Sequence, residues 1–186
     1  MRAIPSFRAP PVINAAEQGD AEAQCILGAC YAGGNYVAQD LAKAIEWWTK
    51  AAEQGHADAQ FMLGGCYNEG MGVSKDSAKA IEWYKKAAEQ GNVKAQNQLA
   101  SCYEHGQNVS QNFEQAVYWT RKAAEQGDVI AQNVLGHYYR KGQGVPQDFD
   151  QAIYWFKKAA EQGDEAGQQM IGVCQNLKNT FNLLGS

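Results

Sequence analysis

The sequence lacks any run of apolar residues close to the roughly 20 that a membrane-spanning helix requires. Residues 1–11 also lack the apolar segment of a secretory signal. We therefore predict no membrane insertion, although a cleaved signal or a trimmed start would leave the same sequence. The chain has no excess of positive charge either, since its formal net charge is -4 and its isoelectric point is near 5.4. This balance argues against binding to nucleic acid, which favours a basic surface.

Sequence motifs for catalysis are missing as well. The chain contains no nucleophile elbow, no His-Glu-x-x-His motif, no phosphate-binding loop and no paired-cysteine metal motif. The three histidines are His56, His105 and His137. A metal site built around them has only two plausible ligands, whereas structural zinc takes four. We therefore predict that the protein is not an enzyme and holds no metal and no cofactor.

The sequence does contain a repeated segment, Ala-Ala-Glu-Gln-Gly. Its copies begin 36 residues apart, at residues 15–19, 51–55, 87–91, 123–127 and 159–163. A fixed period of this length is typical of a solenoid, in which each unit buries its apolar face by stacking on its neighbours. We predict an all-α solenoid over residues 14–172, with repeats at 20–55, 56–91, 92–127 and 128–163 and a partial repeat at 164–176. An irregular segment is expected at 1–13 and a capping segment at 177–186.

Each repeat is predicted to form two antiparallel helices. Residues that can cap a helix precede both: Asp20, His56, Asn92, Asp128 and Asp164 for the first helices, and Asp40, Asp76, Asn112 and Asp148 for the second. The connecting loop needs a positive φ, supplied by Gly72, Asn108 and Gly144 but not by Tyr36, so the first loop should differ in conformation or carry strain, with greater mobility. A column of tryptophans in the second helices is expected to pack between repeats: Trp47, Trp83, Trp119 and Trp155.

The five cysteines form an odd set. Cys30, Cys66, Cys102 and Cys174 occupy one repeat position, and equivalent positions on packed helices lie roughly 9–10 Å apart, too far for a disulfide. We expect free thiols that serve as small buried apolar groups. Reduced thiols favour the cytoplasm, but a trimmed exported protein would show the same features, so the localisation stays open.

The repeated pattern reads Ala-Gln-x-x-Leu-Gly-x-x-Tyr, then Gly-x-Gly-Val-x-x-Asp, then Ala-x-x-Trp-Tyr-x-x-Ala-Ala-Glu-Gln-Gly. It resembles the Sel1-like repeat (SLR) family, a relative of the tetratricopeptide repeat, over about residues 15–172. The resemblance implies a right-handed superhelix whose first helices line a concave groove. It also implies a scaffold or adaptor that binds a protein or peptide partner, often in bacteria.

Groove positions of the related repeats fall on residues that vary between the copies. They are Asp58, Phe61, Asn68, Glu69, Lys94, Asn97, Ser101, Glu104, His105, Asn133, His137, Arg140 and Lys141. The equivalent Asn97 and Asn133 are predicted to hold an extended peptide through its backbone amides. Phe61 offers an apolar anchor. The acidic pair at Asp58 and Glu69 and the basic pair at 140–141 are expected to orient a charged peptide.

Three alternatives to peptide binding remain open from the sequence. The variable positions fit a hydrated polar surface with no ligand. They also fit a module for a non-protein ligand, such as a glycan or cell-wall fragment, that uses Phe61 and the asparagine amides. Finally, a chain that is otherwise a monomer could self-associate weakly through its C-terminal end, where Phe181, Leu183 and Leu184 are expected to be exposed.

Overall fold

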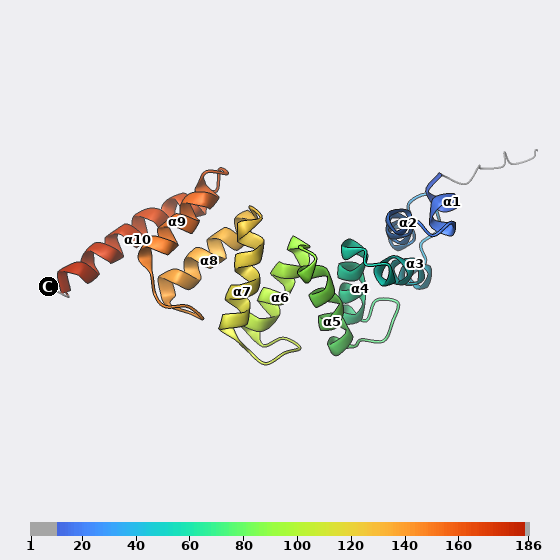
Figure 1. Cartoon of the computed structure of the whole chain (residues 1–186), viewed down its shortest axis with the longest axis horizontal. Coiled ribbons are helices and arrows are strands. Elements are labelled where there is room, and N and C mark those ends of the chain that lie inside the picture. The colour runs from blue at the N-terminus through green and yellow to red at the C-terminus, as the bar shows by residue number, and fades with distance from the viewer. Residues whose placement is uncertain (1–10, 185–186) are drawn as a thin grey trace, which may run out of the picture. The chain divides into compact units, whose positions relative to one another are not determined.

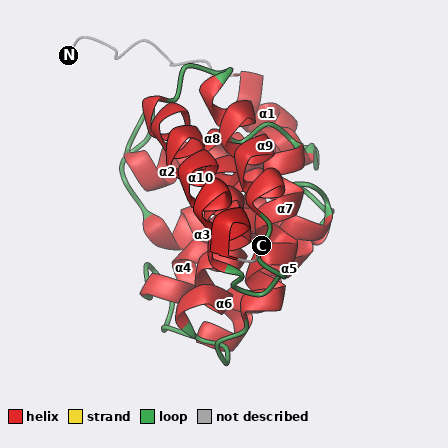
Figure 2. Ribbon diagram, turned by 90° about the vertical axis from the view of Figure 1, so that its left-hand side faces the viewer, coloured by secondary structure: helices red, strands yellow, loops and turns green. Residues whose placement is uncertain are grey.

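The computed structural model describes residues 11–184, except for the side chains of residues 182 and 184. This part of the chain forms ten α-helices and contains no strand (Figures 1 and 2). The helices are α1 Pro11–Glu17, α2 Ala21–Gly33, α3 Leu41–Glu53, α4 Ala57–Glu69, α5 Ser77–Glu89, α6 Val93–His105, α7 Phe113–Glu125, α8 Val129–Lys141, α9 Phe149–Ala160 and α10 Glu165–Leu184. The predicted all-α class and the predicted pair of helices per repeat are confirmed.

The chain divides between Gln90 and Gly91 into two compact units. Unit 1 contains α1–α5 and unit 2 contains α6–α10. Within each unit, every helix packs against the next one along the chain. No described helix is both long enough and apolar enough to cross a membrane.

The predicted N-caps are confirmed in both units. Asp20 Oδ1 accepts a hydrogen bond from the Ala23 N–H at 2.7 Å, and His56 Nδ1 accepts one from the Ala59 N–H at 3.3 Å. The second helices begin in the same way, as when Asp40 accepts from the Lys43 N–H at 3.0 Å. These contacts span three residues, so a short stretch of sequence fixes where each helix starts.

The loop between the two helices keeps one conformation in all four repeats, and this decides between the two alternatives expected for the first loop. The loop residues Tyr36, Gly72, Asn108 and Gly144 have φ values of 65°, 71°, 62° and 68°. Tyr36 thus adopts the left-handed conformation of its glycine equivalents while its side chain is 87% exposed. The first loop does not differ in shape, and it carries the strain of a bulky residue in this region.

The two ends of the array differ from the predicted boundaries. Residues 11–13, expected to be irregular, form the first turn of α1, because proline is well suited to the first position of a helix. Residues 1–10 lie outside the described part. At the other end, α10 is one continuous helix of 20 residues that crosses the predicted boundary between 176 and 177.

The tryptophan column packs against the buried clusters, as expected, but it is not the deepest part of the core. Trp119 is buried, but its equivalents at 47, 83 and 155 are only half-buried. The deepest position is the next residue along, held by Trp48, Tyr84, Thr120 and Phe156, each at most 5% exposed. Successive residues of a helix point about 100° apart around its axis. The tryptophan therefore lies at the edge of the packed layer, and the residue after it points into the centre. Lysine ammonium groups cover the edge, with Lys50 Nζ 4.1 Å from the Trp47 ring centroid.

Buried glutamines tie consecutive repeats together. Gln60 is 4% exposed, its Nε2 donates to the Ala52 carbonyl oxygen at 3.1 Å, and its Oε1 accepts from Gln90 Nε2 at 2.6 Å. In unit 2, Gln132 does the same with Ala124 and Gln162, at 3.2 and 2.9 Å. Each buried amide therefore links two consecutive second helices. Gln60 of α4, for example, contacts α3 through Ala52 and the end of α5 through Gln90. The sequence pattern contains these glutamines, but it did not indicate this role.

Candidate functional site

The predicted partner-binding residues all lie on first helices, and none of them is fully buried. Four belong to α4 in unit 1, namely Asp58, Phe61, Asn68 and Glu69. The others belong to unit 2, with Lys94, Asn97, Ser101, Glu104 and His105 on α6 and Asn133, His137, Arg140 and Lys141 on α8. The structure brings the α6 and α8 residues together within unit 2.

The two asparagines make contacts within the fold that the sequence did not indicate. Asn97 Nδ2 donates to Asp128 Oδ1 at 3.2 Å, and Asn133 Nδ2 donates to Asp164 Oδ2 at 2.9 Å. Each aspartate is the N-cap of the next first helix, 31 residues further along the chain. The amide donors that we expected to hold a peptide therefore hold the neighbouring repeat in this structure.

The Asp164 carboxylate receives a second hydrogen bond, from the Gly167 N–H at 2.6 Å. Hydrogen bonds from this N–H and from the Asn133 amide stabilise the ionised form, so they lower the pKa of Asp164 below its ordinary value of 3.8. The junction between α8 and α10 therefore favours an ionised carboxylate at Asp164.

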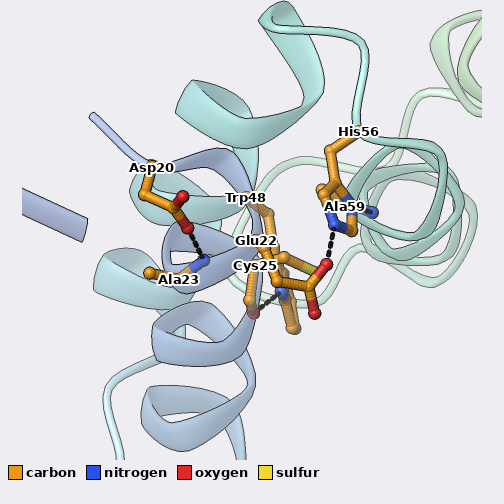
Figure 3. Close-up of polar contacts among 7 residues, drawn as sticks. All are labelled: Asp20, Glu22, Ala23, Cys25, Trp48, His56 and Ala59. Atoms are coloured by element: carbon orange, nitrogen blue, oxygen red, sulfur yellow. Dashed lines mark hydrogen bonds and ion pairs between the residues drawn. The ribbon is translucent and has the colours of Figure 1, made fainter. Parts of the chain in front are cut away.

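In unit 1, a different pair of side chains joins consecutive first helices. His56 Nε2 lies 2.8 Å from Glu22 Oε2, while the other ring nitrogen caps α4 (Figure 3). Beneath this pair, Trp48 Nε1 donates to the Cys25 carbonyl oxygen at 3.2 Å. Burial, with the nearby charges of Asp58 and Glu22, raises the pKa of the Cys25 thiol to about 11. At neutral pH this thiol is protonated, and a protonated thiol is a weak nucleophile.

The cysteines of the chain are all free thiols, as predicted. Cys66, Cys102 and Cys174 are buried, whereas Cys30 is half-buried. Burial raises the pKa of each buried thiol. Within residues 11–184, no three His, Cys, Asp or Glu side chains come close enough to hold a metal ion.

The charges on the first helices differ between the units. In unit 1, α2 and α4 carry Glu22, Asp58 and Glu69 and neither lysine nor arginine. In unit 2, α6 and α8 carry three basic residues, Lys94, Arg140 and Lys141, against the single acidic Glu104. The first-helix face of unit 2 is thus positive although the whole chain has a net charge of -4.

Two adjoining hollows open on this positive face. The first, which we call the Thr120 pocket, has a volume of about 300 Å³ and is lined by Ala100, Thr120, Ile130, Ala131 and Val134, among others. The second, which we call the Arg140 hollow, has a volume of about 260 Å³. It is lined by His137, Tyr138, Arg140 and Lys141, and it shares Glu104 and Val134 with the Thr120 pocket.

Arg140 and His137 give the Arg140 hollow its electrostatic character. Arg140 Nε is shielded from solvent and has no hydrogen-bond acceptor among the described residues. Burial, together with the charges of Arg140 and Lys141, lowers the pKa of His137, which favours the neutral ring. The hollow therefore presents a guanidinium and an ammonium group beside a neutral imidazole, with the Glu104 carboxylate on the side that it shares with the Thr120 pocket.

Comparison with known proteins identifies the repeat. The model of the Sel1 repeat matches residues 21–56, 57–92, 93–128 and 129–164. A protective antigen of uropathogenic Escherichia coli strains, described as displaying an SLR fold, is 41% identical over 86% of this chain and 34% of its own, with a TM-score of 0.80. A Sel1 repeat protein from Oxalobacter formigenes is 37% identical over 87% of this chain and 46% of its own, with a TM-score of 0.81.

A third similar structure is the cysteine-rich protein B of Helicobacter pylori. It is 28% identical over 74% of this chain and 99% of its own, with a TM-score of 0.55. The present chain spans about a third of the Escherichia coli protein and just under half of the Oxalobacter formigenes protein. The comparison with curated proteins gives no match. The similarities confirm the predicted solenoid fold of SLR type.

Proposed function

The chain belongs to the Sel1 repeat family, whose members generally act as protein-interaction scaffolds, and on that premise we propose that it binds an acidic protein segment through the first helices of unit 2. The family is a non-catalytic one, and this chain is proposed to act without catalysis. Its partner is a protein or peptide whose acidic side chains face Lys94, Arg140 and Lys141.

The observation that carries the proposal is the Arg140 hollow. A donor that is buried without an acceptor costs free energy, about 1–3 kcal/mol for an ordinary group. A carboxylate of a bound segment would supply the missing acceptor for Arg140 Nε. Lys141 is exposed beside it and adds a second positive charge. Complementary charge of this kind favours acidic partners over basic ones.

The alternative of a glycan-type ligand depends on Phe61, and the structure weakens its support. The Phe61 ring packs against Tyr84, with the ring centroids 5.7 Å apart and tilted by 40°. It is half-buried rather than presented as a flat platform. The amides of Asn97 and Asn133, which the same alternative needs, hold aspartates of the next repeat.

Self-association through the C-terminal end remains a proposal as well. Phe181 is 60% exposed and Leu183 is 79% exposed on α10, whereas the side chain of residue 184 lies outside the description. A mass that rises with concentration in sedimentation equilibrium would support weak end-to-end contact. A constant monomer mass would exclude it.

The proposed function can be tested with three labelled 12-residue peptides, rich in Glu, Gln or Lys, each with one central tyrosine. Fluorescence anisotropy should show binding in the order Glu, Gln, Lys, and binding of the Glu peptide should weaken as salt is added. Lys141→Glu should weaken that binding about 1.5-fold to fivefold, the range for loss of exposed charge pairs.

Lys157→Glu is the matched control for Lys141→Glu. It reverses one exposed charge in the last turn of a helix of the same unit, but it lies on the second helix α9. Binding of the Glu peptide should be unchanged by it. Equal binding of the three peptides, or equal loss in both variants, would contradict the proposal.

A further inference from the structure

We infer that the Thr120 pocket receives a tyrosine side chain of the bound segment, at a place where the other repeats insert an aromatic ring of their own. This inference rests on the proposed function, because it identifies a second contact of the same acidic segment. Its evidence is independent of charge and comes from the packing of four equivalent positions.

In three repeats, a glycine of the first helix faces an aromatic ring of the second helix. A Cβ atom added at Gly28 would lie 2.6 Å from the Trp48 ring, and one added at Gly64 would lie 2.5 Å from the Tyr84 ring. At Gly136 the corresponding distance to Phe156 is 2.8 Å. These distances are below van der Waals contact, so the ring fills the space that the missing side chain leaves.

The third repeat lacks both members of this pair. Ala100 stands at the glycine position and Thr120 at the aromatic position. Thr120 is only 1% exposed, so the repeat still buries this position, but with a much smaller side chain. The Thr120 pocket, of about 300 Å³, opens over these two residues. The vacant space is therefore a specific property of this repeat.

Polar groups at the Thr120 pocket favour an aromatic ring with a polar tip. Thr120 lines this pocket and Tyr138 lines the adjoining Arg140 hollow. Thr120 Oγ1 and the Tyr138 hydroxyl are both buried, and neither makes a hydrogen bond of standard geometry with a described residue. Burial, together with the nearby Glu104 carboxylate, raises the pKa of Tyr138, and Thr120 lies close enough to the hydroxyl to lower it in part. A phenol hydroxyl that enters with its ring can donate to one oxygen and accept from the other. Two of the three resident rings, Trp48 and Tyr84, also carry a polar tip.

The entrance of the pocket favours an apolar group from outside. Ile130 is 70% exposed there, whereas the equivalent positions of the other repeats carry Glu22, Asp58 and Lys94. An exposed aliphatic side chain beside an apolar pocket gains from contact with an aromatic ring. Since the Arg140 hollow adjoins the pocket, the segment that fits both presents a tyrosine close to an acidic residue.

The decisive variant closes the pocket with the chain's own ring. Ala100→Gly combined with Thr120→Phe recreates the Gly136 and Phe156 pair in the third repeat. The probes are the Glu-rich peptide with its central tyrosine and the same peptide with alanine there. The natural chain should bind the tyrosine peptide about tenfold more tightly, as expected for a buried aromatic side chain. The double variant should bind both peptides equally and keep its preference for Glu over Lys peptides.

The outcomes separate this inference from the proposed function. A natural chain that prefers Glu peptides but binds the tyrosine and alanine forms equally would overturn the pocket and leave the function standing. A natural chain that shows no preference for Glu over Lys peptides would overturn both the pocket and the proposed function. The free chain could also form a dimer that the double variant abolishes. In that case the pocket would receive a side chain of a second copy of this chain, and the inference of a separate protein partner would be wrong.

A second variant guards against misfolding of the double variant, which circular dichroism would reveal. Ile130→Gln changes an exposed residue at the entrance and should leave the fold intact. It should reduce the preference for tyrosine over alanine about twofold to threefold, with no effect on the preference for Glu over Lys. An unchanged tyrosine preference in this variant would count against the proposed entrance.

Discussion

The two units build the same junction between first helices from different chemistry. In unit 1, Glu22 of α2 pairs with His56, the cap of α4, at 2.8 Å. In unit 2, the amide of Asn133 on α8 holds Asp164, the cap of α10, at 2.9 Å. The buried glutamine contacts beneath these junctions are the same in both units, as Gln60 and Gln132 show.

This difference shows which parts of a repeat are free to vary. Most buried positions, such as Gln60 and Gln132, repeat because each must fit the next copy, whereas the first-helix surface changes its polar pairs and its charge. The exception in the core is the second-helix position of Thr120, where a small side chain replaces an aromatic ring. Unit 2 therefore combines an ordinary core with a positive, hollowed face. Substitutions at matching positions of the two units would measure how far they are alike and where they part.

The largest expected effect comes from the buried glutamines, where the units should behave alike. Gln60→Ala removes the side-chain donor to the Ala52 carbonyl oxygen and one of the two acceptors of the Gln90 amide. Gln132→Ala does the same to Ala124 and Gln162. Each change should lower the free energy of unfolding by about 2 to 4 kcal/mol, measured by urea titration.

Gln151→Ala is the control for both glutamine variants, because Gln151 is exposed on a second helix and its change should be nearly neutral. The two buried variants should agree within about 1 kcal/mol, since their contacts match. A large difference between them would show that the shared core does not carry equal weight in the two units.

A smaller effect is expected at the loop residue with positive φ, where the units differ. Tyr36→Gly should raise the free energy of unfolding by about 0.5 to 1 kcal/mol, because relief of left-handed strain exceeds the added freedom of glycine in the unfolded chain. Asn108→Gly in unit 2 should change it by only a few tenths of a kcal/mol, since asparagine tolerates this conformation. Thermal unfolding of both variants and of Tyr36→Asn measures the difference. Destabilisation by Tyr36→Gly would mean that the exposed ring has a structural role.

Local contacts explain how much of the fold could be predicted from the sequence. Helix starts were predictable because the cap at Asp20 bonds only three residues away. The deepest aromatic position was not, because the choice between Trp47 and Trp48 depends on how each helix is rotated against its neighbours. For the Tyr36 loop the sequence left a different shape or strain open, and the structure has the strained form because the common loop geometry prevailed over the preference of one residue.

The candidate site shows the same limit. The variable first-helix positions could be located by aligning the repeats, but the partner of Asn133 lies 31 residues away and no local rule indicates it. The Thr120 pocket did leave a signal in the sequence. Ala100 and Thr120 replace a glycine and an aromatic residue together, and the significance of this double change becomes clear only when the two positions are seen in contact.

The smallest expected effect is a pH dependence that belongs to the junction of unit 2. The pKa of Asp164 is lowered in the folded chain, so its contribution to stability is complete above the ordinary value of 3.8 and is lost as the pH falls through the lowered pKa. Asn133→Ala removes one of the two hydrogen bonds responsible, so the loss of stability on acidification should become smaller. Gln169→Ala, at the equivalent exposed position of α10, is the control and should leave the acid dependence unchanged. Urea titrations between about pH 2 and 5 measure this slope, and an identical slope in Asn133→Ala and the natural chain would show that the asparagine does not hold the carboxylate in its ionised form.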